Sequence, residues 1–270
     1  GWGTSLAWWA NVVGGYNETA LRRTVRDNLI QSIFSDTGLR LNVVRYNIGG
    51  GENPSQPLSN IEYRARVPGY LSGANAAYDW TQDSNQRYVL QQAKAYGVNK
   101  FEAFSNSPPY WMTISGTVRG ATDGGNNLQT TYYATFAKYL TDVVYQFKTQ
   151  WGITFDTLAP MNEPSSGYWN SKTNFKQEGC GFLGAKQSDI IELLGAKLKN
   201  ANLATLVSAA DETNTDQAYK GWDALRSTAK NYIQRLNSHT YSGGSEHWLN
   251  ARASNDRKRL WVSEYGDGDA

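Results

Sequence analysis

The chain has 270 residues, of which 40% are hydrophobic, 13% aromatic and 19% charged, and its formal net charge is +2. This composition suits one large globular core and a single domain, residues 1–270. The 26 basic residues form no cluster, so we expect no nucleic acid as a partner. No stretch is long and apolar enough for a membrane span, so we expect no membrane as a partner either. We expect the protein to be a monomer.

Apolar periodicity predicts strands and helices that alternate along the whole chain. The expected strands are 2–6, 39–46, 100–105, 155–161, 205–210, 232–238 and 260–263. The expected helices run from Asn17 to before Gly38, over 84–96, over 131–150, from Ser188 onward, over 216–229 and over 245–253. Seven strands alternating with six helices indicate an α/β fold with a parallel sheet.

The first expected helix has a clear cap and a clear apolar stripe. Asn17 is interpreted as its N-cap, although Asn17-Glu18-Thr19 is also a glycosylation sequon. The apolar residues recur at every fourth position and are expected to form the buried face; they are Leu21, Val25, Leu29 and Ile33.

Loop lengths distinguish between the possible parallel folds. The exits from the second, third and fourth strands span roughly twenty to thirty residues, whereas the returns to the next strand are short. This asymmetry favours a TIM-type barrel whose functional face lies at the carboxyl ends of the strands. A doubly wound sheet would carry a glycine-rich phosphate turn after its first strand, and Gly49-Gly50-Gly51 follows the second without that pattern.

Two of the expected strands end in a glutamate. The run Leu158–Met161 leads through Asn162 to Glu163, and Trp261–Ser263 leads directly to Glu264. Strand ends of a barrel meet at one mouth, so the two carboxylates are expected close together. Retaining glycoside hydrolysis needs an acid and a nucleophilic carboxylate about 5–5.5 Å apart. We therefore interpret Glu163 and Glu264 as a catalytic pair.

Other side chains at this face are candidates for substrate binding. Arg45 lies in an apolar strand and is expected to hold Glu264 ionised, unless it forms an ordinary barrel ion pair. Asn162 is expected to bind a sugar hydroxyl, with a turn-forming role as the alternative. His239 and Tyr241, in a polar run after the sixth strand, are expected to bind substrate. Aromatic residues beyond strand ends are candidate sugar platforms; Trp111 and Tyr265 are preferred, beside Trp8, Trp9, Tyr110 and Trp169.

Several chemistries find no support in the sequence. Cys180 is the single cysteine, so no internal disulfide can form, and we expect a free buried thiol. His247 is expected on a helix surface. No cluster of acidic residues and histidines has metal-ligand spacing, and no Gly-x-Ser-x-Gly elbow occurs. We expect no metal and no cofactor.

Five segments, in order along the whole chain, resemble family 30 of the glycoside hydrolases. These are Gly1–Trp9, Val44–Asn47, Phe101–Met112, Met161–Pro164 and Ser263–Gly266. The tryptophan-rich start and the segment Phe104–Met112 look most like the endo-β-1,6-galactanase branch of that family.

The resemblance implies a retaining mechanism with Glu163 as acid/base and Glu264 as nucleophile, without a cofactor. It also implies secretion and galactan side chains as the polysaccharide substrate; the sequence opens at Gly1 without a signal-peptide pattern, so we expect that any such segment has been removed or was not included. Family members continue past the seventh strand into an eighth strand and a β-rich side domain. We therefore expect this sequence, which stops at Ala270, to be a truncated barrel.

The sequence leaves three other functions open. A β-1,6-glucanase or a xylanase of the same family would carry the same two glutamates. A catalytically inactive carbohydrate-binding barrel fragment would keep the aromatic rim without turnover. Only a comparison of substrates and a test for turnover distinguish these functions.

Overall fold

The structure is a computed structural model, and it describes residues 1–56 and 61–266. In these residues seven parallel strands form one sheet in chain order, with β1 and β7 at the two ends of that order. The strands are β1 Gly3–Ser5, β2 Val43–Asn47, β3 Lys100–Phe104, β4 Thr157–Ala159, β5 Leu206–Glu212, β6 Ile233–His239 and β7 Arg259–Glu264. Each strand is hydrogen-bonded to the next, because each crossover helix returns the chain to the neighbouring position.

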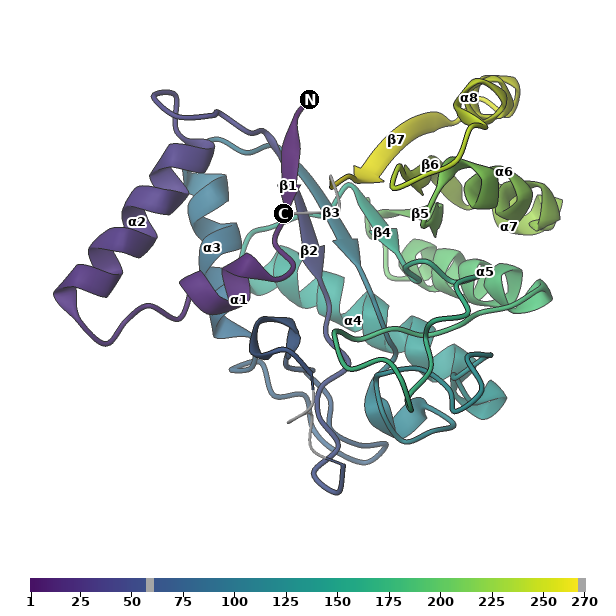
Figure 1. Ribbon diagram of the computed structural model, residues 1–270, viewed down its shortest axis with the longest axis horizontal. Coiled ribbons are helices and arrows are strands. Elements are labelled where there is room, and N and C mark those ends of the chain that lie inside the picture. The colour runs from purple at the N-terminus through teal and green to yellow at the C-terminus, as the bar shows by residue number, and fades with distance from the viewer. Residues whose placement is uncertain (57–60, 267–270) are drawn as a thin grey trace.

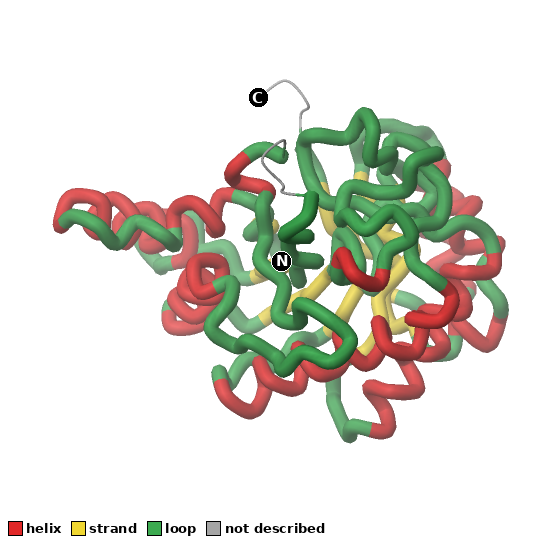
Figure 2. The backbone as a smooth tube through the Cα atoms, turned by 90° about the horizontal axis from the view of Figure 1, so that it is seen from below, coloured by secondary structure: helices red, strands yellow, loops and turns green. Residues whose placement is uncertain are grey.

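Helices cover the outside of this sheet. They are α1 Trp9–Val13, α2 Ala20–Phe34, α3 Ser84–Ala95, α4 Tyr133–Gln150, α5 Ala185–Asn200, α6 Thr215–Ala224, α7 Ser227–Lys230 and α8 Glu246–Asn255. Short 3-10 turns lie at η2 Tyr63–Ala65, η3 Tyr110–Met112 and η4 Thr130–Tyr132. Figure 2 shows the strands inside and most helices around them. The sheet therefore curves into a nearly closed barrel, and the predicted TIM-type fold is confirmed.

The core forms where α4 packs against the strands. The face of α4 that carries Phe136, Val143 and Phe147 is buried, as the sequence predicted. The ring of Phe147 makes edge contacts with Tyr46 of β2, at 4.8 Å between centroids, and with Phe155, at 5.1 Å. Because strands of a parallel sheet are covered on both faces, such aromatic contacts between helix and strand stabilise the barrel wall.

Several predicted boundaries were wrong by a few residues. β2 begins at Val43, and β4 is limited to three residues. The helix predicted over 216–229 divides at Leu225 and Arg226, whose extended backbones separate α6 from α7. Ser188 is not a cap: it is buried inside α5, and its hydroxyl oxygen accepts a hydrogen bond from the backbone N–H of Arg226.

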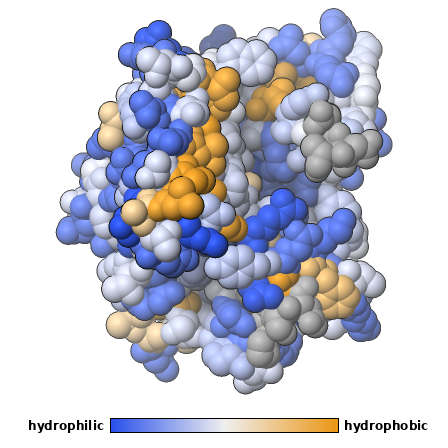
Figure 3. Space-filling view, turned by 60° about the vertical axis from the view of Figure 1, so that its left-hand side comes forward, coloured by the Kyte–Doolittle hydropathy of each residue, from blue (hydrophilic) through white to orange (hydrophobic). Residues whose placement is uncertain are grey.

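The first long helix, α2, differs from its prediction in both cap and face. Thr19 is the N-cap, since its hydroxyl accepts from the N–H of Arg22, whereas Asn17 lies outside the helix and accepts from the Arg26 guanidinium. Most of the predicted apolar stripe faces outward, with Leu21 74% exposed, and only Ile33 of the four packs partly against the core. The buried positions are Arg26, Ile30 and Phe34. Helix α2 stands away from the barrel at the left of Figure 1, and Figure 3 shows a hydrophobic strip on that side of the molecule.

The two faces of α2 are therefore expected to respond differently to shortened side chains. Ile30→Val should lower the free energy of unfolding by about 0.5–1.5 kcal/mol, because it removes a methylene group from a packed site. Leu21→Ala removes more carbon but should change that free energy by no more than about 0.5 kcal/mol, because the side chain is exposed. Denaturant titration of both variants checks this, and a larger loss for Leu21→Ala would contradict the observed face.

The long connections all lie on one side of the barrel. The segments that follow β2, β3 and β4 gather below the sheet in Figure 1, beyond the carboxyl ends of the strands. The exits of β5 and β6 are shorter, and β5, β6 and β7 end at the same side of the barrel. This end is where a barrel of this kind presents its functional groups.

Candidate active site

One large cavity opens at the carboxyl ends of the strands. Its volume is about 920 Å³, and both strand-end glutamates line it. The other side chains that line it and contribute to the site described below are Trp8, Trp9, Asn162, Tyr168, Trp169, Tyr241 and Tyr265. A concave site of this size with convergent polar groups is the usual form of a ligand pocket.

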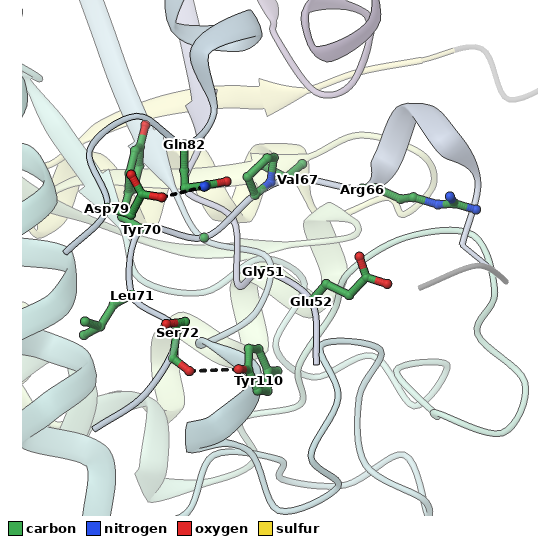
Figure 4. Close-up of a pocket in the computed structure, with 12 residues that line it drawn as sticks. Gly51, Glu52, Arg66, Val67, Tyr70, Leu71, Ser72, Asp79, Gln82 and Tyr110 are labelled. Carbon is green, nitrogen blue, oxygen red and sulfur yellow. Dashed lines mark hydrogen bonds between the residues drawn. The ribbon is translucent and has the colours of Figure 1, made fainter. Parts of the chain in front are cut away.

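A smaller cavity, of about 350 Å³, lies among the connections after β2 and β3. Figure 4 shows that polar groups around it are engaged with one another. Gln82 donates to Asp79 at 2.7 Å, and the Tyr110 hydroxyl donates to the carbonyl oxygen of Ser72 at 2.8 Å. Neither strand-end glutamate lines this cavity, so the larger one is the candidate active site.

Glu163 is held by its backbone as well as by its side chain. Strand β4 ends at Ala159, so Asn162 and Glu163 lie beyond the regular alternation of a strand, and both line the cavity. The φ of Glu163 is +49°, an unusual value for a residue with a side chain. Its N–H donates to the carbonyl oxygen of Asp211 at 2.8 Å, and its own carbonyl oxygen accepts from the indole N–H of Trp169 at 2.9 Å. These bonds fix the turn that presents the carboxylate.

The Glu163 carboxylate has two polar partners. The hydroxyl of Tyr168 donates to Oε2 at 2.6 Å, and His239 Nδ1 lies 3.0 Å from Oε1. Burial and the neighbouring Glu163 charge raise the pKa of Tyr168 above its ordinary value, so this phenol stays a donor.

Glu264 is held in its ionised form. Arg45 Nη1 donates to Oε2 at 2.8 Å, and the Tyr241 hydroxyl donates to Oε1 at 2.8 Å. Burial acts to raise the pKa of Glu264, but the charges of His239 and Arg45 and the bond from Tyr241 outweigh it and hold this pKa below its ordinary value. The contact between Arg45 and Glu264 that the sequence predicted is present.

The two carboxylates share one imidazole. His239 is completely buried at the end of β6, with Nδ1 toward Glu163 and Nε2 3.7 Å from Glu264 Oε2. Burial acts to lower the pKa of His239, but the surrounding carboxylates overcome it and raise this pKa to about 10. The surrounding carboxylates therefore favour the imidazolium form of this side chain.

Arg45 contacts both residues that line the cavity and residues in the interior of the barrel. Its Nη2 donates to Asp211 Oδ2 at 2.7 Å and to Asn162 Oδ1 at 2.8 Å, and its Nε lies 3.6 Å from Glu102 Oε1. The guanidinium stacks on the ring of Phe104, with Cζ 3.5 Å from the ring centroid. Burial acts to lower the pKa of Arg45, but the three carboxylates raise it above its ordinary value.

The structure adds site residues that the sequence reasoning missed. Asp211 and Glu212 end β5, and a signal was present, because they directly follow an apolar run in the same way as Glu163 and Glu264 do. Glu102 lies in the middle of β3 and is completely hidden by its partners. Tyr168 lies in a long loop, where no local pattern marks it.

The candidate sugar platforms separate into three groups. Tyr265 is 73% exposed and lines the cavity beside Trp8 and Trp9. Trp169 also lines the cavity but is almost completely buried, and its indole supports the backbone of Glu163. Trp111 does not line it: this indole packs edge-on against Tyr132 and donates to the carbonyl oxygen of Leu71.

Three further features concern the part of the chain that the structure describes. Cys180 is buried and free, as predicted, and burial raises its pKa to about 12. His247 is exposed on α8, also as predicted. Within residues 1–56 and 61–266, no group of three or more acidic, His or Cys residues has the geometry to hold a metal ion, and no helix is long and apolar enough to cross a membrane.

Sequence comparisons relate the chain to known enzymes. The profile of O-Glycosyl hydrolase family 30 matches residues 1–252. The chain is 37% identical to an endo-β-1,6-galactanase of Hypocrea rufa, over 100% of this chain and 59% of that protein. It is 28% identical to an exo-β-1,6-galactobiohydrolase of Bifidobacterium longum subsp. longum, over 98% of this chain and 23% of that protein. The chain thus spans less than two thirds of the length of either relative.

Solved structures show the same fold at low identity. A conserved exported protein from Bacteroides fragilis superposes with a TM-score of 0.83 at 21% identity, over 100% of this chain and 60% of that chain. An endo-β1,6-glucanase superposes with a TM-score of 0.72 at 21% identity, over 100% of this chain and 58% of the glucanase chain.

Proposed function

The chain belongs to O-Glycosyl hydrolase family 30, and we propose that it is a retaining glycoside hydrolase with Glu163 as acid/base and Glu264 as nucleophile. The observation that carries the proposal is the shared environment of the two carboxylates, which face one cavity and contact the same imidazole. The two environments also differ, because Arg45 pairs with Glu264 and helps to hold the pKa of Glu264 below its ordinary value, whereas the Tyr168 hydroxyl donates to Glu163.

The proposed reaction has two steps. In the first, a Glu264 oxygen forms a bond to the anomeric carbon while the bond to the leaving oxygen breaks, and Glu163 gives its proton to that oxygen. In the second, Glu163 accepts a proton from water, whose oxygen replaces Glu264 at the anomeric carbon. Asn162 would bind the sugar: its carbonyl oxygen accepts from Arg45, which leaves its NH₂ group for a hydroxyl in the cavity.

We propose β-1,6-galactan as the polysaccharide, cleaved within the chain. Support comes from the 37% identity with an endo-β-1,6-galactanase, which extends over the whole sequence. Aromatic side chains at the cavity, Trp8, Trp9 and Tyr265, provide surfaces on which sugar rings can stack. A polymer of this kind is encountered outside the cell, and we therefore propose secretion.

A panel of polysaccharides tests this function. The protein should release oligosaccharides of several lengths from β-1,6-galactan, and much less from β-1,6-glucan or xylan, with Glu264→Gln as the control that separates catalysis from contamination. Equal release by Glu264→Gln would refute the assignment. Saturable binding of galactan oligosaccharides without turnover at any protein concentration would instead indicate a carbohydrate-binding barrel.

Tyr241→Phe should shift the pH dependence of this reaction. The hydroxyl stabilises ionised Glu264 through a 2.8 Å hydrogen bond, so its loss should raise the pKa of the nucleophile. A hydrogen bond to a charged group is worth about 1.5–3 kcal/mol, and solvent replaces part of it at this exposed tyrosine. The acid limb of kcat/KM should therefore move upward by about one pH unit. An unchanged acid limb would show that Tyr241 does not act on Glu264.

A further inference from the structure

Asp211 occupies an unusual position at the end of β5. The pairing register between β5 and β6 shifts between Ala210 and Glu212, so Asp211 lies in an irregularity of the ladder. Its φ is +59°, and its side chain is completely buried. An irregularity in the ladder changes the direction in which a side chain points. A positive φ is unfavourable for a residue other than glycine, and it persists only where the surrounding contacts hold the backbone in that conformation. The carboxylate of Asp211 points to the interior of the barrel mouth, where its partners lie.

This one residue contacts both strand ends that carry the catalytic pair. Its carbonyl oxygen accepts from the N–H of Glu163 at 2.8 Å. Its carboxylate accepts from the hydroxyl of Ser263, the neighbour of Glu264, at 2.6 Å, and from Arg45 at 2.7 Å. Its Oδ1 also lies 3.4 Å from Nε2 of His239. The residue therefore connects the backbone of the proposed acid/base to the segment that holds the nucleophile.

The contacts around His239 determine its charge. Nδ1 lies 3.0 Å from Glu163, while Nε2 faces Asp211 at 3.4 Å and Glu264 at 3.7 Å. A neutral imidazole carries a proton on only one nitrogen, so its other nitrogen would present a lone pair to a carboxylate. An imidazolium carries a proton on both nitrogens, so it is attracted to the carboxylates on both sides, although Nε2 makes no hydrogen bond at these distances. The other titratable groups near the ring are Tyr241, 6.0 Å between ring centroids, and Arg45, which contacts both Asp211 and Glu264.

We propose that Asp211 is a positioning residue that holds His239 as an imidazolium between the two catalytic carboxylates. The catalytic part of this inference rests on the proposed glycoside hydrolysis, whereas the charge state of His239 does not. With Asp211 ionised, His239 serves as a fixed cation that stabilises Glu264 as a carboxylate.

Two observations support this role for Asp211. Arg45, Ser263 and His239 all favour its ionised form, and although burial raises the pKa of Asp211, these partners hold it well below its ordinary value. The adjacent Glu212 is also completely buried, but its partners are Ser165, at 2.7 Å and 3.1 Å, and Gln187 at 3.4 Å. The two neighbouring carboxyl groups thus face different elements, and only Asp211 contacts His239.

Histidine NMR tests the proposal without any need for turnover. The chain has two histidines, so ¹⁵N-labelled imidazole signals can be assigned with His247→Gln, and in all other variants exposed His247 is an internal reference. In the wild type, both ring nitrogens of His239 should carry protons at pH 7. In Asp211→Asn, the titration of His239 should move down by about 1–3 pH units, because a carboxylate in contact is removed. Glu212→Gln, the matched loss of a buried carboxyl group, should move it by far less.

Three results would overturn the proposal. A neutral His239 at pH 7 in the wild type would do so even if Asp211→Asn failed to fold. An unchanged His239 titration in Asp211→Asn, or an equal shift in Glu212→Gln, would show that Asp211 has no special influence. In kinetics, Asp211→Asn should lower kcat more than it changes KM and should raise the acid limb of its pH profile. If the wild type cleaves no glycan, the proposed hydrolysis fails, while the NMR result still decides the charge of His239.

Discussion

Replacing Glu264 with alanine is expected to abolish hydrolysis of β-1,6-galactan, and added azide is expected to restore reaction on an activated aryl β-glycoside with inverted configuration. Without its carboxylate, the protein cannot form the glycosyl-enzyme bond of a retaining mechanism. Azide can occupy the vacated space and attack the anomeric carbon directly. A single displacement inverts that carbon, so the product should be an α-glycosyl azide.

Glu163→Ala should behave differently because Glu163 is the proposed proton donor. Hydrolysis of galactan should fall by about 10²–10⁴-fold, the usual contribution of general acid catalysis. An activated aryl glycoside needs little protonation, so formation of the glycosyl-enzyme should be nearly retained. Azide then attacks that intermediate in a second displacement, and the product should be a β-glycosyl azide.

Proton NMR of the anomeric signal distinguishes the two products. Glu18→Ala, at an exposed glutamate beside the start of α2, controls for the general effect of removing a carboxylate. Circular dichroism verifies that both site variants are folded. A β-azide from Glu264→Ala together with an α-azide from Glu163→Ala would reverse the two assignments. The same configuration from both would exclude this division of roles.

The part of the site that the sequence predicted depends on local patterns. Glu163 and Glu264 follow apolar strands, and parallel strands of a barrel end at one mouth, so their proximity follows from the order of the elements. Arg45 was recognisable as a charge in a buried strand. These inferences need only the type of each residue and the period of its surroundings.

The sequence did not predict the buried face of α2 or the positions of Asp211 and Tyr168, because these depend on tertiary contacts and not on the local pattern of residues. Helix α2 carries one apolar series through Leu21 and Val25 and another through Ile30 and Phe34, and only the path of the chain decides which meets the barrel. Asp211 faces inward because of a register shift, which a sequence read as a regular strand does not reveal. Tyr168 reaches Glu163 from a loop whose shape is set by tertiary contacts.

Arg45→Met is expected to cost about 3–5 kcal/mol of the free energy of unfolding, because it leaves buried carboxylates without their cation. The side chain of Arg45 is 5% exposed, and it contacts Asp211, Glu264 and Glu102. Arg226→Met is a matched control: this guanidinium also contacts two carboxylates, of Asp189 and Glu192, but its side chain is 42% exposed. Solvent screens such a pair, so its loss should lower the free energy of unfolding much less than the loss of Arg45 does.

The pH dependence of this cost identifies its origin. In the folded wild type the pKa values of Asp211 and Glu264 lie below their ordinary values. Such groups stabilise the fold above their unfolded pKa values, and this stabilisation is lost as pH falls through the folded ones. The deficit of Arg45→Met should therefore be largest near neutral pH and become smaller toward acid pH, because the carboxylates that have lost their cation bind protons at a higher pH in the variant than in the wild type. Denaturant unfolding from pH 3 to 7 measures this, and a deficit independent of pH would indicate lost packing on Phe104 rather than lost charge pairing.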